Sequence, residues 1–263
     1  MGRRIVKYWA YAEIGYREAR QDAIELYGRV AFLALILGVF SALWKAVGAQ
    51  ALPLTATPRS MVWYLATTEW ILLSTPQLYA QVEQEVRQGD VTYQLTRPVS
   101  YLGSRLARGL GALLARSPLL FIGAFGFARI FSGEWPERWA GVLYVIPLGV
   151  LASIVLMTCY LVLGLFAFWL GDITPLYWIW QKATFVLGGL MLPLEFYPAL
   201  FVRLAHLTPF PTLLNLPASF IFEIPSVGVA RLVLGLFGWL LVAIIVAQWL
   251  FRRAISSLAS HGG

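Results

Sequence analysis

Three charged residues lie inside or beside long apolar stretches, where a charge needs a structural or functional reason. Glu69 lies in one apolar stretch, Arg116 lies in the next, and Asp172 lies at a junction between two later ones. A charge at the centre of a bilayer is costly unless it is paired or hydrated, so such residues commonly mark a transport pathway. These positions are the first candidates for a functional site.

Glu69 and Arg116 have three possible roles. Counting along helices puts Glu69 about 13 Å below the outer edge of its span and Arg116 about 16 Å above the inner edge of the next. These levels nearly coincide in a hydrocarbon core of about 30 Å, so an ion pair between the two is one expectation. A Glu69 that faces a cationic substrate is the second. A shifted register, with one residue at the headgroups, is the third.

The sequence contains little that could support enzymatic chemistry. Neither His206 nor His261 belongs to a Ser/His/Asp triad, an H-E-x-x-H motif or a set with zinc-ligand spacing. The single cysteine, Cys159, cannot form an intrachain disulfide. No G-x-x-x-x-G-K-[ST] loop is present to bind phosphates. We therefore expect no catalytic residue, metal or cofactor on this chain, and any ATP and Mg²⁺ would bind to a partner.

The composition requires a solvent other than water for much of the chain. Hydrophobic residues make up 59% and charged residues 13%, against about 45–50% and about 25% in soluble domains. The formal net charge is +7, but the basic residues lie at the ends of apolar stretches, where they orient membrane helices. This placement argues against nucleic-acid binding and indicates contact with membrane lipid.

Six apolar stretches are each long enough to cross a membrane as a helix, since a span needs about 20 residues. The fold class is therefore an all-α membrane protein of six transmembrane helices, in a single transmembrane domain over residues 1–263. The predicted spans are Leu26–Val47, Ser60–Gln81, Arg105–Phe131, Ala140–Leu170, Pro175–Leu194 and Val229–Phe251.

Basic residues set the orientation. With the N-terminus in the cytoplasm, the cytoplasmic regions contain more arginine and lysine than the outer regions do. The positive-inside rule therefore favours a multi-pass protein of the inner, or cell, membrane with both termini cytoplasmic.

Three further segments complete the predicted layout. Residues 1–25 form an amphipathic surface helix, although an ordinary solvated helix would show the same pattern. Residues 82–104 form a mixed-charge cytoplasmic loop, which could also be a plain linker. Residues 195–228 form an apolar outer connection that prolines divide into short helices, and these can enter the membrane only where other helices cover their backbone.

Two of these loops resemble a known family. The cytoplasmic loop runs from Gln88 through Arg97 and Pro98 to Tyr101 and is similar to a "G-x-hydrophobic…L-x-R-P" loop. The outer connection carries a matching proline pattern from Leu192 onward. Together with the six-span layout, they resemble the type-2 ABC exporter permeases, in the branch with paired six-span permeases and a separate ATPase.

The resemblance implies roles for particular residues. It makes the cytoplasmic loop a coupling helix that docks on the ATPase, and it makes the outer connection a cap over the substrate pathway. Glu69 and Arg116 are the pathway candidates. The implied ATPase-coupling residues are Glu83, Glu85, Val86, Arg87, Gln88, Asp90, Leu95, Arg97 and Pro98. The implied outer-cap residues are Pro193, Glu195, Pro198, Pro209 and Pro217.

The expected function is the permease subunit of an ATP-driven exporter, with two copies of an ABC ATPase and a second six-span permease, identical or homologous. A membrane scaffold or channel subunit without ATP coupling is the main alternative. A membrane-embedded lipid-modifying enzyme is a weaker one. It would need converging acidic, histidine or lysine side chains near one interface, and only Asp172 and Lys182 come near that requirement at the inner face.

Overall fold

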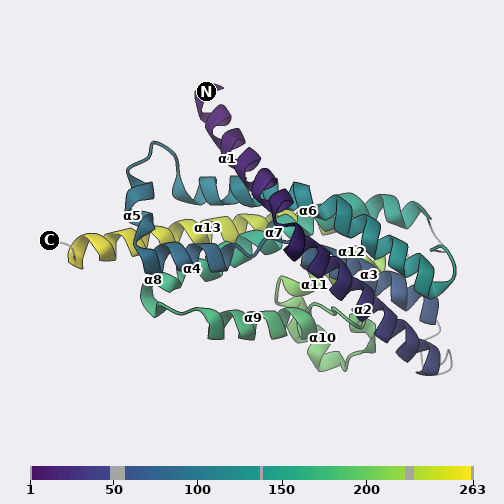
Figure 1. Cartoon of the computed structure of the whole chain (residues 1–263). Coiled ribbons are helices and arrows are strands. Elements are labelled where there is room, and N and C mark those ends of the chain that lie inside the picture. The colour runs from purple at the N-terminus through teal and green to yellow at the C-terminus, as the bar shows by residue number, and fades with distance from the viewer. Residues whose placement is uncertain (1, 48–56, 137–138, 223–227, 262–263) are drawn as a thin grey trace.

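The computed structural model describes residues 2–47, 57–136, 139–222 and 228–261, and its described elements are all helical (Figure 1). The elements in chain order are α1 Gly2–Gln21, α2 Ala23–Val47, α3 Pro58–Ser74, α4 Leu78–Gln88, α5 Asp90–Leu95, α6 Tyr101–Ser132, α7 Trp139–Leu165, α8 Ala167–Leu170, α9 Thr174–Leu187, the 3-10 helix η2 Leu194–Phe196, α10 Ala199–His206, α11 Phe210–Leu213, α12 Asn215–Ser219 and α13 Val229–His261.

Four helical segments in the described part of the chain are long and apolar enough to cross a membrane. They are α2, α6, the stretch Trp139–Leu170 that joins α7 to α8, and Val229–Ser256 of α13. They correspond to the first, third, fourth and sixth predicted spans. The long helices run roughly side by side, and α1 crosses them obliquely (Figure 1).

The second predicted span is not one continuous helix. The predicted helix over Ser60–Gln81 is interrupted, because α3 ends at Ser74 and α4 begins at Leu78. Pro76 explains the break, since proline has no N–H for the helical hydrogen bond and its ring clashes with the preceding turn. The segment Thr75–Gln77, called the break below, divides the predicted span into two helices.

The fifth predicted span, Pro175–Leu194, is also shorter than expected. α9 has 14 residues, or about 21 Å, and ends where two glycines follow Leu187. Gly189 adopts a φ of +65°, a left-handed conformation that glycine takes without strain. The chain then turns into the broken connection.

Prolines begin the short pieces of that connection. Pro193 precedes η2, Pro198 precedes α10 and Pro209 precedes α11. The buried Asn215 side chain ties the pieces together: its Oδ1 atom accepts from the backbone N–H of Leu194 at 3.1 Å and lies 2.9 Å from the Tyr64 hydroxyl on α3. The connection therefore packs against the bundle, as the sequence predicts for an apolar segment whose backbone must be covered.

The described helices form two hydrophobic cores. The larger one joins α2, α3, α6 and α7 with parts of α9 to α13. A smaller one, called the end core, lies toward the end of the bundle that carries α5 and the C-terminus (Figure 1). Its buried residues are Leu78, Val82, Val91, Tyr101, Leu102, Met157, Leu161, Leu165, Ala247 and Leu250.

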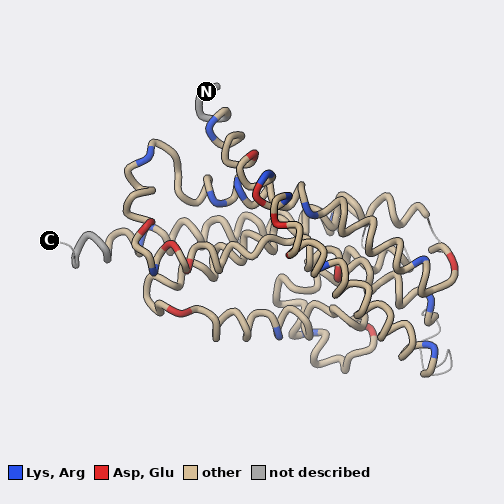
Figure 2. Tube along the Cα trace, in the orientation of Figure 1, with Lys and Arg blue, Asp and Glu red and all other residues tan. Residues whose placement is uncertain are grey.

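Charged residues are sparse along the long apolar helices (Figure 2). Figure 2 shows them gathered along α1, around α4 and α5, and at the opposite end of the molecule. This distribution agrees with a protein whose middle lies in lipid and whose two ends lie in water.

Candidate functional site

The break between α3 and α4 satisfies its exposed backbone groups with particular side chains. The Ile71 carbonyl accepts from the Thr75 hydroxyl at 2.7 Å and the Ser153 hydroxyl of α7 at 3.3 Å. The Leu72 carbonyl accepts from the Thr75 backbone N–H at 3.3 Å. The Leu73 carbonyl accepts from the guanidinium of Arg29 on α2. These hydrogen bonds stabilise the break, since backbone groups away from water need such partners.

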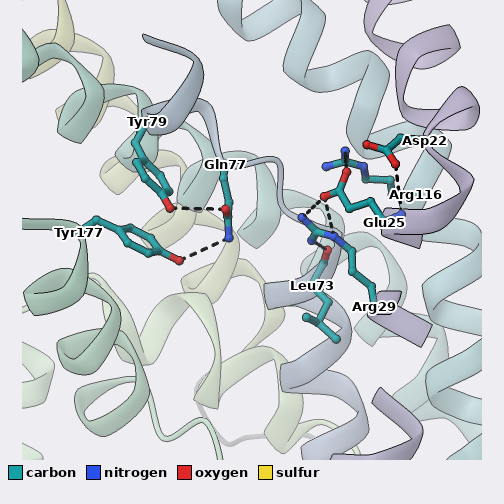
Figure 3. Close-up of polar contacts among 8 residues, drawn as sticks. All are labelled: Asp22, Glu25, Arg29, Leu73, Gln77, Tyr79, Arg116 and Tyr177. Carbon is teal, nitrogen blue, oxygen red and sulfur yellow. Dashed lines mark hydrogen bonds and ion pairs between the residues drawn. The ribbon is translucent and has the colours of Figure 1, made fainter. Parts of the chain in front are cut away.

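Arg29 belongs to a charged cluster beside the break (Figure 3). Its Nε and Nη2 atoms donate to Glu25 Oε1 at 3.0 and 2.6 Å. The other oxygen of Glu25 accepts from Arg116 Nη2 of α6 at 2.7 Å. Asp22 caps the start of α2 by accepting from the Glu25 backbone N–H at 3.1 Å. The cluster thus joins α2, α6 and the end of α3, and its formal charges balance.

An aromatic and amide cluster lies on the other side of the break. The rings of Tyr79 on α4 and Tyr177 on α9 stack with centroids 4.0 Å apart, and Tyr160 of α7 meets both edge-on. Gln77 lies 3.4 Å from the Tyr177 hydroxyl and 3.5 Å from the Tyr79 hydroxyl (Figure 3). These contacts hold α4 against α9 and α7.

The expected ion pair between Glu69 and Arg116 is wrong, because Arg116 pairs with Glu25. The depth count assumed that the third span begins at the membrane edge. α6 is 32 residues long, or about 48 Å, which exceeds a hydrocarbon core of about 30 Å. The first turns of α6 lie against α1 and α4. Arg116 lies further along α6, where it meets Glu25 at the start of α2.

Glu69 is buried in α3 with 2% of its surface exposed. Among the described residues, its Oε2 atom has no hydrogen-bond partner. Burial of a carboxyl oxygen without a hydrogen-bond partner costs free energy. A water molecule or a bound ligand that donates a hydrogen bond to Glu69 would reduce this cost. Glu69 therefore remains a pathway candidate, whereas the position of Arg116 marks a structural ion pair.

The predicted coupling loop is a short helical arm. α4 continues to Gln88, α5 follows, and the chain re-enters the bundle at Tyr101. Arg105 on α6 pairs with Glu85 of α4 and donates to Gln94 Oε1 of α5 at 2.5 Å. Tyr101 donates to the same Glu85 at 2.7 Å. With Val91 buried in the end core, these contacts fix α5 to α4 and α6.

The predicted coupling residues divide into two groups. Glu83, Glu85 and Val86 are half-buried: Glu83 lies 3.7 Å from Arg87, Glu85 serves Arg105, and Val86 packs on the end core. The second group is exposed and is therefore accessible to a partner protein. The exposed predicted residues are Arg87, Gln88, Asp90, Leu95, Arg97 and Pro98. Tyr93, which the sequence interpretation passed over, is 65% exposed on the same arm.

α1 packs directly on α6 beside this arm. A Cβ added at Gly15 would collide with the Arg108 backbone, and one added at Gly111 would collide with the backbone of α1. Arg108 also binds Glu18 through two nitrogens at 2.7 and 2.6 Å. The Tyr11 hydroxyl of α1 lies near Arg97 and raises the pKa of Arg97. α1 is therefore fixed to the same unit as the arm.

The remaining predicted residues have plain structural positions. In the outer connection Pro193 and Pro217 are buried, Pro209 is half-buried, and Glu195 and Pro198 are exposed. Asp172 accepts from the Thr174 backbone N–H at 2.9 Å at the start of α9, and this hydrogen bond lowers the pKa of Asp172. No cluster of His, Cys, Asp and Glu suited to a metal occurs in the described ranges.

The sequence interpretation missed the break and the roles of Arg29 and Glu25. Pro76 inside an expected span was the available signal, because proline interrupts helices. An acid and an arginine four residues apart at the start of α2 were a second signal, since they form a helical ion pair. Nothing in the sequence order connects these residues to Leu73 or Arg116.

Comparison with known proteins gives one result. The model of a family described as "ABC-2 family transporter protein" matches residues 59–262. No curated protein and no solved structure matches the chain. The matched region includes the break, the arm and the broken outer connection.

Proposed function

Because the chain belongs to the ABC-2 transporter family, we propose that it forms the substrate pathway of an ATP-driven exporter and is coupled to a separate ATPase. Family membership makes it a multi-pass transport subunit of a membrane, and not itself a catalytic enzyme. The exporter direction, the ATP coupling and the partners belong to the proposal.

The observation that best supports coupling is the arm formed by α4 and α5. Tyr93 and Leu95 are exposed at 65% and 39%, and exposed aromatic and aliphatic side chains commonly anchor protein interfaces. The arm is fixed to the bundle through Glu85, Arg105 and Val91. A partner that pushes on Tyr93 and Leu95 would therefore move α4 and the start of α6.

The proposed assembly has two permeases and two ATPases. One chain of this size offers little room for an enclosed pathway, so a second permease, identical or homologous, would face it. ATP and Mg²⁺ would bind to the ATPases, and closure of the ATPase dimer would switch the permeases between two arrangements of packed helices.

The proposed topology has six membrane crossings with both termini in the cytoplasm. α3 with α4 and α9 with its connection would supply the two crossings that lack one long helix. Single cysteines at Gly133 and Gln88, in a Cys159→Ala background, test this layout. An impermeant thiol reagent should label Gly133 from outside intact cells and should leave Gln88 unlabelled; the reverse pattern would overturn the orientation.

The function itself is tested by co-purifying the chain with candidate ATPase and permease subunits and reconstituting the complex in lipid. ATP hydrolysis should rise on assembly and should respond to compounds that the vesicles accumulate. Stable assembly without ATP hydrolysis, or hydrolysis that no Tyr93 or Leu95 substitution alters, would favour a scaffold or channel subunit.

A further inference from the structure

We propose that Arg29 is a positioning residue that fixes α4 relative to α3 by satisfying the Leu73 carbonyl at the break. The proposal rests on the proposed function in one respect: it assigns the break as the hinge through which the arm acts on the membrane helices.

The break needs an external donor. In a continuous helix the backbone N–H of Gln77 would reach the Leu73 carbonyl, but Gln77 adopts φ −84° and ψ 72°, outside the helical region. The Leu72 carbonyl, which Pro76 cannot serve, already takes the Thr75 N–H. The Arg29 side chain, from another helix, serves the Leu73 carbonyl.

Arginine suits this task better than other residues. Its planar guanidinium has several donors in fixed directions, so it can bind a carbonyl and a carboxylate together. Arg29 uses Nη1 for Leu73 and both Nε and Nη2 for Glu25. Only 15% of its side chain is exposed, so water competes little for these bonds.

Glu25 and Arg116 hold Arg29 in place. Glu25 lies one turn before Arg29 on α2, and its second oxygen binds Arg116 of α6 at 2.7 Å. α6 also carries Arg105, which pairs with Glu85 of α4. One helix therefore contacts α4 directly and, through Arg116 and Glu25, contacts the group that binds Arg29. Motion of α4 relative to α3 would be taken up between Leu73 and Leu78, where the helical hydrogen bonds are interrupted.

The experiment measures the position of α4 directly. Spin labels are placed at Gln84 on α4 and Leu114 on α6, both exposed, in full-length chain lacking Cys159, and the distance distribution is recorded in lipid nanodiscs. The compared variants are Arg29→Met, Arg29→Lys, Pro76→Ala and the pair Arg29→Met with Pro76→Ala. Arg17→Met is the control, because Arg17 pairs with Glu13 on the exposed surface of α1, away from the break.

The parent chain and Arg17→Met should give one narrow distance peak. Arg29→Met should lose that narrow peak, and Arg29→Lys should regain it in part. Pro76→Ala restores a backbone N–H, so helix can continue through the break. The double variant should therefore regain a narrow peak at a changed distance.

Two results would overturn the proposal. A narrow, unshifted peak in Arg29→Met would mean that Arg29 does not fix α4. A broad peak that Pro76→Ala does not narrow would mean that Arg29 acts through packing and not through the Leu73 carbonyl. Both comparisons are made without nucleotide, so they remain readable if no ATPase partner binds and the proposed function fails.

Discussion

Arg116 Nη2 lies 2.7 Å from Glu25 Oε2 and joins the middle of α6 to the first turn of α2. Glu25 also binds Arg29 four residues later, so one carboxylate serves two guanidinium groups. All three side chains are partly shielded from water. A substitution that leaves one charge unpaired at this junction should therefore lower the free energy of unfolding. Removal of both charges of a pair should lower it less.

We expect Arg116→Met and Glu25→Gln each to lower the free energy of unfolding by about 1–3 kcal/mol, the usual cost of stranding a buried polar partner. The double variant should lose less than the sum of the two, because the Arg116–Glu25 contact can be lost only once. Urea or thermal unfolding in detergent measures this cycle. Additive losses would contradict a direct Arg116–Glu25 interaction.

Glu69 should behave differently, because its Oε2 atom has no hydrogen-bond partner among the described residues. We expect Glu69→Gln to raise the unfolding midpoint, by about 2–4 °C if the unmet desolvation cost is about 1 kcal/mol. If Glu69 faces substrate, the same variant should lose transport of cationic compounds and keep transport of neutral ones. Thr68→Val is the comparison on α3. Thr68 donates a hydrogen bond to the Leu190 carbonyl at 2.7 Å, so its replacement should lower the stability of the protein. A clear loss of stability in Glu69→Gln would instead show a missing partner.

Contact between α1 and α6 should be sensitive to a single methyl group. Gly15→Ala and Gly111→Ala should each cost about 1–3 kcal/mol, the usual penalty for overpacking a close contact. Gly126→Ala on the same α6 is the control, because nothing lies within 4 Å of its added Cβ. Thermal unfolding and protease sensitivity of α1 measure the effect. Equal behaviour of Gly111→Ala and Gly126→Ala would mean that α1 does not pack as described.

Residues of the arm should separate docking from folding. Tyr93→Ala and Leu95→Ala should leave the free permease as stable as the parent but weaken ATPase binding about tenfold or more, or about 1.4 kcal/mol. Glu85→Lys should destabilise the free permease, because it opposes Arg105. Affinity capture of the ATPase and unfolding of the permease alone distinguish these cases. Unchanged affinity in both exposed variants would place the docking surface elsewhere.

Apolar length predicted much of this fold. The helices that match the first, third, fourth and sixth spans begin and end within several residues of the predicted limits, apart from the longer C-terminal end of α13. This is expected, because hydrophobic length alone sets such spans. Apolar length did not predict the interruptions within two spans. Pro76 divides the second predicted span, and the glycines after Leu187 end the helix of the fifth early.

Charge partners could not be predicted in the same way. Counting residues gives a depth only if each helix starts at the membrane edge, and α6 does not. The partner of Arg116 is Glu25, 91 positions away in the chain, and only the packing of α1, α2 and α6 brings the two together. The arm was predicted as a segment, but its inward and outward faces depend on Arg105 and the end core.

The end core also sets an order of events during synthesis. Val91 on α5 and Tyr101 on α6 are made early, but Ala247 and Leu250, which complete the same core, belong to the last helix. Chains are made from the N-terminus, so the arm cannot reach its final packing until α13 has emerged. A partner that recognises the packed arm would thus bind finished permeases and leave truncated or half-made chains unoccupied.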